Sequence, residues 1–164
     1  MKGVRIMARI SKAIPQTVSS INIYKLKMVK EDTVEYSDTT IKSPCDIVRL
    51  AREVLEMEEM AEENFIVICL NTKNKIAGVH TVSIGSLNAS IVHPREVFKA
   101  ALLNNASGII CLHNHPSGDP EPSREDIETT HRLVNAGNIL GVKVLDHVII
   151  GDDRYVSLKE QGAM

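Results

Sequence analysis

The sequence has few aromatic residues and few cysteines. Its 164 residues include two phenylalanines, three tyrosines and no tryptophan. The core must therefore be largely aliphatic, and few rings are available to stack on the bases of single-stranded nucleic acid. The three cysteines, Cys45, Cys69 and Cys111, are an odd number without a close pair. This pattern argues against a secreted disulfide framework and against a CxxC-type zinc site.

Long apolar runs are also missing from the sequence. No stretch approaches the ~18 consecutive apolar residues of a membrane span. The N-terminus carries charged residues but no apolar segment long enough for a signal peptide. We therefore expect a cytoplasmic protein without a membrane partner.

Acidic and basic residues are unevenly distributed along the chain. The net charge is −2, but the first 30 residues contain seven lysines or arginines and no acidic residue. The other residues therefore carry a net charge of −9. A basic segment of this kind can bind nucleic acid or an acidic partner, although a solvated arm is the simpler interpretation.

The composition indicates one globular domain preceded by an extension. Hydrophobic residues make up 43% of the chain and charged residues 24%, which is typical of soluble domains. We interpret residues 1–17 as a basic N-terminal arm. Residues 18–42 are predicted to form a strand or hairpin extension, because residues 21–29 alternate between apolar and polar side chains. Residues 43–164 then form the main domain, which is long enough to bury a core without a metal or disulfide.

In the main domain, the apolar pattern alternates between the period of helices and that of strands. Ser-Pro, His-Pro and Ser signals mark the starts of helices, and continuous apolar runs are typical of strands buried on both faces. Helices are predicted to begin near Ser43, His93 and Ser123, and strands to cover residues 65–70, 76–84, 108–112, 142–150 and 154–158. This order predicts a single α/β domain with a mixed sheet.

Candidate metal ligands are concentrated in residues 113–126, which read HNHPSGDPEPSRED. His113 and His115 lie two apart at the end of a predicted strand, so both imidazoles point to the same side. Two histidines with Asp126 would make a zinc site that leaves one position for water, as catalytic zinc sites do, and zinc lowers the pKa of such a water to about 7. By spacing alone, Ser123 and Asp126 are equally well explained as a helix N-cap and its first-turn acid.

The same segment resembles the JAMM motif of JAB/MPN+ metalloproteases, in which His-x-His is followed, seven residues later, by Ser-x-x-Asp. Residues 116–122 are the seven residues between the two parts here. More narrowly, the chain is similar to the bacterial RadC family over roughly residues 43–160. The similarity extends beyond the motif to residues 65–72, 85–88, 93–96 and 146–151.

The resemblance implies a three-layer α/β/α domain of the cytidine-deaminase-like superfamily, so that residues 43–164 would be a RadC-like JAB/MPN domain. It implies that zinc is bound by His113, His115 and Asp126 and that Ser123 helps to stabilise the oxyanion. RadC proteins usually carry a helix-hairpin-helix region before this domain. The residues before position 43 are too few for one, and we expect a stand-alone form.

The resemblance also implies a glutamate that acts as general acid and base. RadC proteins have a glutamate two residues before the phenylalanine of the first buried strand, and Glu63 matches that position. Glu96 is the alternative, although it is simply explained as a first-turn helix acid. His147, beside Asp146 on a predicted strand, either supports the metal site or belongs to the core, and the core is the simpler interpretation.

The function predicted first is a zinc-dependent hydrolase that cleaves a peptide or isopeptide bond, with a peptide or protein as substrate. One alternative is a DNA repair or recombination accessory protein that binds nucleic acid through the basic arm. The acidic remainder of the chain and the scarcity of aromatic residues argue against it. The other alternative is a metal-dependent nuclease, although a site for one metal suits phosphodiester cleavage less well than a two-metal site.

Overall fold

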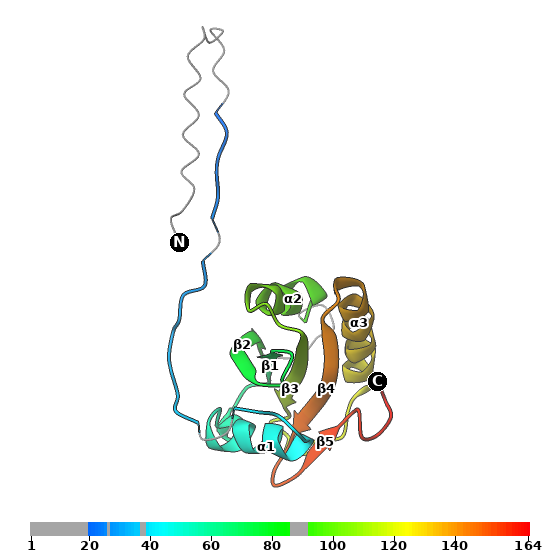
Figure 1. Ribbon diagram of the computed structural model, residues 1–164. Coiled ribbons are helices and arrows are strands. Elements are labelled where there is room, and N and C mark those ends of the chain that lie inside the picture. Colours follow the sequence, from blue (N-terminus) through cyan, green and yellow to red (C-terminus); the bar gives the residue numbers. More distant parts are fainter. Residues whose placement is uncertain (1–19, 26, 37–38, 86–91) are drawn as a thin grey trace, which may run out of the picture. The chain divides into compact units, whose positions relative to one another are not determined.

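The computed structural model describes residues 20–25, 27–36, 39–85 and 92–164 (Figure 1). The chain divides into two units, residues 1–30 and residues 31–164. In the first unit the described residues contain neither a helix nor a strand. The predicted basic arm of residues 1–17 lies outside the described residues.

The strand predicted over residues 21–29 is not formed in the described part of that stretch. Its alternating pattern supplies an apolar face, but Ile21 and Ile23 are 88% and 95% exposed. A strand needs a neighbour to pair with and a surface to cover its apolar face, and neither is present here among the described residues. Among the described residues, Thr40 forms an isolated β-bridge with Lys75, just before β2.

From residue 44 onward, helices and strands follow one another in the predicted order. The elements are α1 (Pro44–Glu53), the 3-10 helix η1 (Met57–Glu59), β1 (Asn64–Leu70), β2 (Ile76–Ile84), α2 (Pro94–Leu103), β3 (Gly108–Asn114), α3 (Arg124–Leu140), β4 (Lys143–Ile150) and β5 (Tyr155–Ser157). Three helices begin where the Ser-Pro, His-Pro and Ser signals predict. Among the described residues, no helix has both the length and the apolar character that a bilayer span requires.

The five strands form one mixed sheet in the order β2-β1-β3-β4-β5. β1 runs antiparallel to both β2 and β3, whereas β3 and β4 are parallel. Parallel neighbours need a crossover connection, and α3 supplies it between β3 and β4. The parallel pair therefore brings the ends of β3 and β4 to the same edge of the sheet.

Helices cover both faces of the sheet, with α1 on one side and α2 and α3 on the other (Figure 1). Successive side chains of a strand point to opposite faces, so the apolar run of β1 contributes to both cores. Ile66 and Ile68 pack with α1, while Phe65 and Val67 pack with α2 and α3. The predicted single α/β domain with three layers is confirmed.

The two cysteines that we expect in the core, Cys69 and Cys111, are fully buried free thiols. Burial raises the pKa of Cys69 to about 11. The thiol form therefore dominates at neutral pH, and Cys69 behaves as a small apolar side chain.

Candidate metal centre

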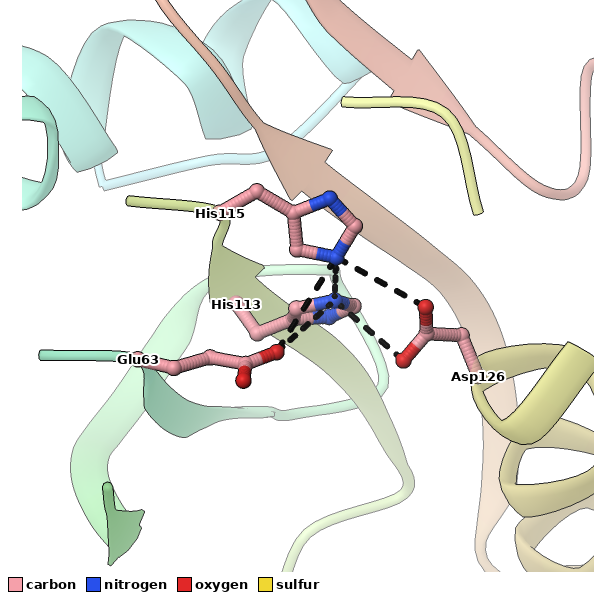
Figure 2. Close-up of side chains that lie close together, drawn as sticks. All are labelled: Glu63, His113, His115 and Asp126. Atoms are coloured by element: carbon pink, nitrogen blue, oxygen red, sulfur yellow. Dashed lines mark hydrogen bonds and ion pairs between the residues drawn. The ribbon is translucent and has the colours of Figure 1, made fainter. Parts of the chain in front are cut away.

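Four side chains that offer metal ligands converge at the end of β3 (Figure 2). They are Glu63, His113, His115 and Asp126. One ligand atom from each lies within 4.8 Å of the others. The structure thus brings together the three predicted ligands and the glutamate predicted first.

The pairing of β1 with β3 explains how Glu63 reaches the two histidines. Because the two strands are antiparallel, the start of β1 lies beside the end of β3, and Phe65 pairs with His113. Glu63 immediately precedes β1 and therefore lies at the same edge of the sheet. Asp126 comes from the first turn of α3, which begins after the loop that follows His115.

The nitrogen and oxygen atoms of the ligands lie at similar distances from one another. His113 Nε2 and His115 Nε2 are 3.0 Å apart. Asp126 Oδ1 lies 3.4 Å from His113 Nε2, and Asp126 Oδ2 lies 3.6 Å from His115 Nε2. In a tetrahedral zinc site with bonds of roughly 2.0 Å, ligand atoms are separated by about 3.3 Å. This donor set therefore fits Zn²⁺.

Glu63 lies farther from the histidines than Asp126 does. Its Oε1 atom is 3.9 Å from both Nε2 atoms, and the side chain is 22% exposed. The side chain of Asp126 is only 6% exposed. The cluster is thus closed on the side of Asp126 and accessible to solvent on the side of Glu63.

A hydrogen bond behind His115 decides which of its nitrogens faces the cluster as a ligand. His115 Nδ1 lies 2.7 Å from the carbonyl oxygen of Asp119. A carbonyl can only accept, so Nδ1 carries the proton and donates it. In neutral His115 the lone pair is therefore on Nε2, which points at the cluster.

The electrostatic environment favours the forms of His113 and Asp126 that bind metal. Burial, together with the neighbouring imidazole of His147, holds the pKa of His113 well below its ordinary value. Burial raises the pKa of Asp126, but the proximity of His115 and His113 outweighs it, and the net pKa is well below the usual range. The neighbouring carboxylate of Asp126 also raises the pKa of His115, so that a proton competes with a metal for Nε2.

The RadC-like JAB domain family matches residues 41–163 of this chain. The chain belongs to this family. The resemblance predicted from the motif is thereby confirmed, and His113, His115 and Asp126 of the motif are among the side chains that converge in Figure 2.

The chain is also similar to UPF0758 proteins. That of Caldanaerobacter subterraneus subsp. tengcongensis is 64% identical over 123 residues, which are 75% of this chain and 52% of the relative. That of Halalkalibacterium halodurans is 61% identical over 122 residues, 74% of this chain and 52% of the relative. That of Methanosarcina barkeri is 52% identical over 140 residues, 85% of this chain and 60% of the relative. The chain spans about half the length of the first two of these curated relatives.

Ser123 caps α3 in this RadC-like domain. Its hydroxyl donates to Asp126 Oδ2 at 2.6 Å, and its oxygen accepts from the backbone N–H of Asp126 at 3.1 Å. The capping explanation of these two residues is therefore confirmed, and it holds together with the presence of Asp126 in the cluster. The role of Ser123 at the oxyanion stays a prediction.

Glu96, the alternative acid–base residue, is not one of the four converging side chains. It lies in the first turn of α2 and forms ion pairs with Arg95 and Lys99. Of the two glutamates considered, only Glu63 joins the cluster.

Asn114 is a residue of the site that the sequence analysis missed. Its side chain is buried, with Oδ1 accepting from the backbone N–H of Asn64 at 2.8 Å and Nδ2 donating to the carbonyl of Glu62 at 3.1 Å. These bonds hold both chain neighbours of Glu63. An amide between the two histidines, at the end of an otherwise apolar strand, was the available signal for this role.

Proposed function

We propose that this domain is a zinc-dependent hydrolase that cleaves a peptide or isopeptide bond. The observation that carries the proposal is the convergence of two histidine nitrogens, one buried carboxylate and one more accessible glutamate (Figure 2). Structural zinc sites are usually closed by four protein ligands, whereas catalytic sites have three and leave a position for water. The family and the donor set both support this assignment.

His113, His115 and Asp126 are the residues that would hold the metal. Bound zinc would supply Lewis acidity, which lowers the pKa of a water to about 7 and polarises a carbonyl oxygen. His113 and Asp126 are buried, and their donor atoms lie 3.4 Å apart.

Glu63 is assigned the proton transfers of the reaction. Its carboxylate is 3.9 Å from both Nε2 atoms, beyond ordinary hydrogen-bond length, and its side chain is partly exposed. A carboxylate in this place can take a proton from the attacking water and deliver it to the leaving amine. Ser123 would donate to the oxyanion of the substrate after its hydroxyl turns away from Asp126.

The experiment that tests this function combines elemental analysis with a cleavage screen of the full chain. We expect about one zinc per chain and cleavage of substrates in a library of peptide and isopeptide bonds. His113→Ala should lose the zinc and the activity but remain folded, because the two cores do not depend on the metal.

His131→Ala is the matched control. His131 lies exposed on α3, with Nε2 3.1 Å from the carbonyl oxygen of Ala163, and should keep the zinc. Zinc content unchanged by His113→Ala would disprove the metal assignment. A fully zinc-loaded protein that cleaves none of the amide bonds would exclude the peptidase assignment.

Nucleic-acid binding by the N-terminal segment is the second candidate function. Its support is that Lys25, Lys27 and Lys30 are exposed, on chain that forms neither a helix nor a strand. Cationic side chains on such a segment can contact phosphates, and binding would then weaken steeply with added salt. Salt-sensitive DNA binding by a preparation that cleaves no amide bond would favour this function, and metal-dependent cleavage of the DNA would favour a nuclease.

A further inference from the structure

Behind the candidate metal centre, a chain of buried hydrogen bonds links one predicted ligand to the backbone of another. His147 Nε2, on β4, lies 2.8 Å from His113 Nδ1, the ring nitrogen that faces away from the cluster. His147 Nδ1 lies 2.5 Å from Thr130 Oγ1, and Thr130 Oγ1 lies 2.7 Å from the carbonyl oxygen of Asp126. His113, His147 and Thr130 are at most 1% exposed.

We infer that His147 and Thr130 are positioning residues that hold His113 in the tautomer needed to bind a metal. The inference rests on the proposed metal site. It assigns a role in that site to a histidine that is otherwise simply explained as part of the core, and to a threonine that the motif does not contain.

The direction of the hydrogen bonds follows from the chemistry of the acceptors. The carbonyl of Asp126 can only accept, so the single hydroxyl proton of Thr130 is used in donating to it. Thr130 Oγ1 must then accept from His147 Nδ1–H. If the hydroxyl proton pointed at His147 instead, two oxygen lone pairs would face each other at 2.7 Å.

The direction of these hydrogen bonds also determines which nitrogen of His113 carries the proton. A neutral His147 with its proton on Nδ1 has a lone pair on Nε2, which accepts from His113 Nδ1–H. The lone pair of His113 is then on Nε2, facing His115 Nε2 at 3.0 Å, where the lone pair of neutral His115 also points. Two such lone pairs at this distance need a cation between them, which is a metal ion or, without one, a proton.

This chain of hydrogen bonds, which we call the relay, also joins three elements of the fold around the site. It begins at a ligand on β3, passes through β4 and α3, and ends at the backbone of a ligand on α3. Partners behind metal-bound histidines fix the tautomer and the orientation of the ring, and their loss typically weakens metal binding by about 10- to 100-fold.

Nitrogen-15 NMR of histidine-labelled, metal-free protein tests the proton order directly. We expect both His113 and His147 to carry their protons on Nδ1. A proton on Nε2 of His147 would mean that the relay runs in the opposite direction, which would overturn the inference. This readout needs neither activity nor bound metal, so it remains decisive if the proposed hydrolase function fails.

Zinc affinity, measured by competition with a chelator, tests the same residues by substitution. His147→Phe removes the acceptor and should weaken zinc binding by about 10-fold or more. His147→Gln places an amide oxygen where Nε2 lies and should restore most of the affinity. Thr130→Val and Thr130→Ser form a second pair, because only serine keeps the hydroxyl.

The conservative variants separate a positioning role from a merely structural one. His147→Gln and Thr130→Ser keep the acceptor and the hydroxyl, whereas His147→Phe and Thr130→Val remove them. If the first two variants bind zinc like the wild type and the last two bind it more weakly, the relay positions His113. If all four variants bind zinc like the wild type, or if all four lose it equally, the positioning role is disproved.

Discussion

Asp126 takes part in two structures at once, the capping box of α3 and the cluster of candidate ligands. Oδ2 accepts hydrogen bonds from the backbone and the hydroxyl of Ser123, while Oδ1 lies 3.4 Å from His113 Nε2. The cap therefore fixes the carboxylate relative to the helix before any metal binds. At this residue, the start of the helix and the geometry of the site depend on the same atoms.

Glu63→Gln is the substitution that separates proton transfer from metal binding. Glutamine keeps the size and the polarity of the side chain but removes the base. Because Glu63 is more distant from the histidines than Asp126 is, the three candidate ligands should still hold the metal. Zinc content and melting temperature should stay near those of the wild type, while peptide hydrolysis should fall by about 10²-fold or more.

Glu96→Gln is the control for Glu63→Gln. Glu96 pairs with Arg95 and Lys99 on α2, away from the four converging side chains, so its loss should leave hydrolysis largely intact. Loss of hydrolysis in Glu96→Gln alone would show that Glu96, and not Glu63, transfers the proton. If neither variant lost activity, the proton transfer would belong to another group.

The sequence predicted the residues of the motif better than the residues that support them. His113 and His115 share a direction because of local strand geometry, which a spacing of two is enough to indicate. The contact between His113 and His147 spans 34 positions and depends on the parallel register of β3 and β4, in which Cys111 pairs with His147. No local pattern contains that register, so a place in the core was the simpler interpretation of His147.

At the scale of elements, the turn between β4 and β5 supports the loop that carries His115. His115 N–H donates to the carbonyl of Ile150 at 2.8 Å, and Asp152 N–H donates to the carbonyl of Gly118 at 2.9 Å. The loop also contains Asp119, whose carbonyl fixes the tautomer of His115. Displacement of this turn should therefore also displace His115, a candidate metal ligand.

Gly151→Ala should displace the loop and weaken zinc binding. A Cβ atom at Gly151 would lie 2.4 Å from the carbonyl oxygen of Gly118 and 2.7 Å from Pro120 Cδ, so the backbone must move. We expect a lower melting temperature of the metal-free protein and a zinc affinity lower by about 10-fold, as for other supports of metal ligands. Calorimetry and chelator competition measure the two effects separately.

Gly137→Ala provides the matched control for the turn. Its Cβ would also lie 2.4 Å from a backbone oxygen, that of Val142, so the steric conflict is comparable. Gly137 is about 16 Å from Asp126 along α3. The Gly137→Ala substitution should therefore lower stability but not zinc affinity. An equal loss of zinc affinity in Gly137→Ala and Gly151→Ala would mean that general destabilisation causes the effect.

The elements themselves were predictable wherever the local signal is complete. Proline and serine mark the helix starts, and the doubly buried runs give β1 and β3. The alternation of residues 21–29 was misleading because it shows only that the segment has one apolar face. A strand also needs a hydrogen-bonding neighbour, which the pattern of a single segment cannot supply.

At the scale of the whole molecule, the order of the strands assembles the site. Glu63 and Asp126 are far apart in the chain, yet the antiparallel β1–β3 pair and the crossover through α3 bring both to the end of β3. The sequence indicated a mixed sheet but not this order, because strand order depends on packing among all elements. The buried histidines of this edge also make the stability of the molecule depend on pH.

The metal-free domain should lose stability when the pH falls from about 7 to about 5. Burial lowers the pKa of His147 from 6.5 to about 4 and holds that of His113 well below its ordinary value. Between the folded-state and unfolded-state pKa values of each histidine, the unfolded chain binds a proton that the folded chain does not. The free energy of unfolding therefore decreases as the pH is lowered. His147 alone should account for about 2 kcal/mol of this loss.

The other titrating groups of the site should not cause this loss. The pKa of His115 is raised by Asp126, so its stabilising effect is complete below the unfolded value and is lost only as the pH rises through the raised pKa. The pKa of Asp126 is lowered well below the usual range, and its contribution is lost only in stronger acid. Urea unfolding of chelator-treated wild type and His147→Gln measures the effect. The variant should lose less unfolding free energy than the wild type between these pH values. Equal losses in both proteins would mean that His147 does not cause the pH dependence.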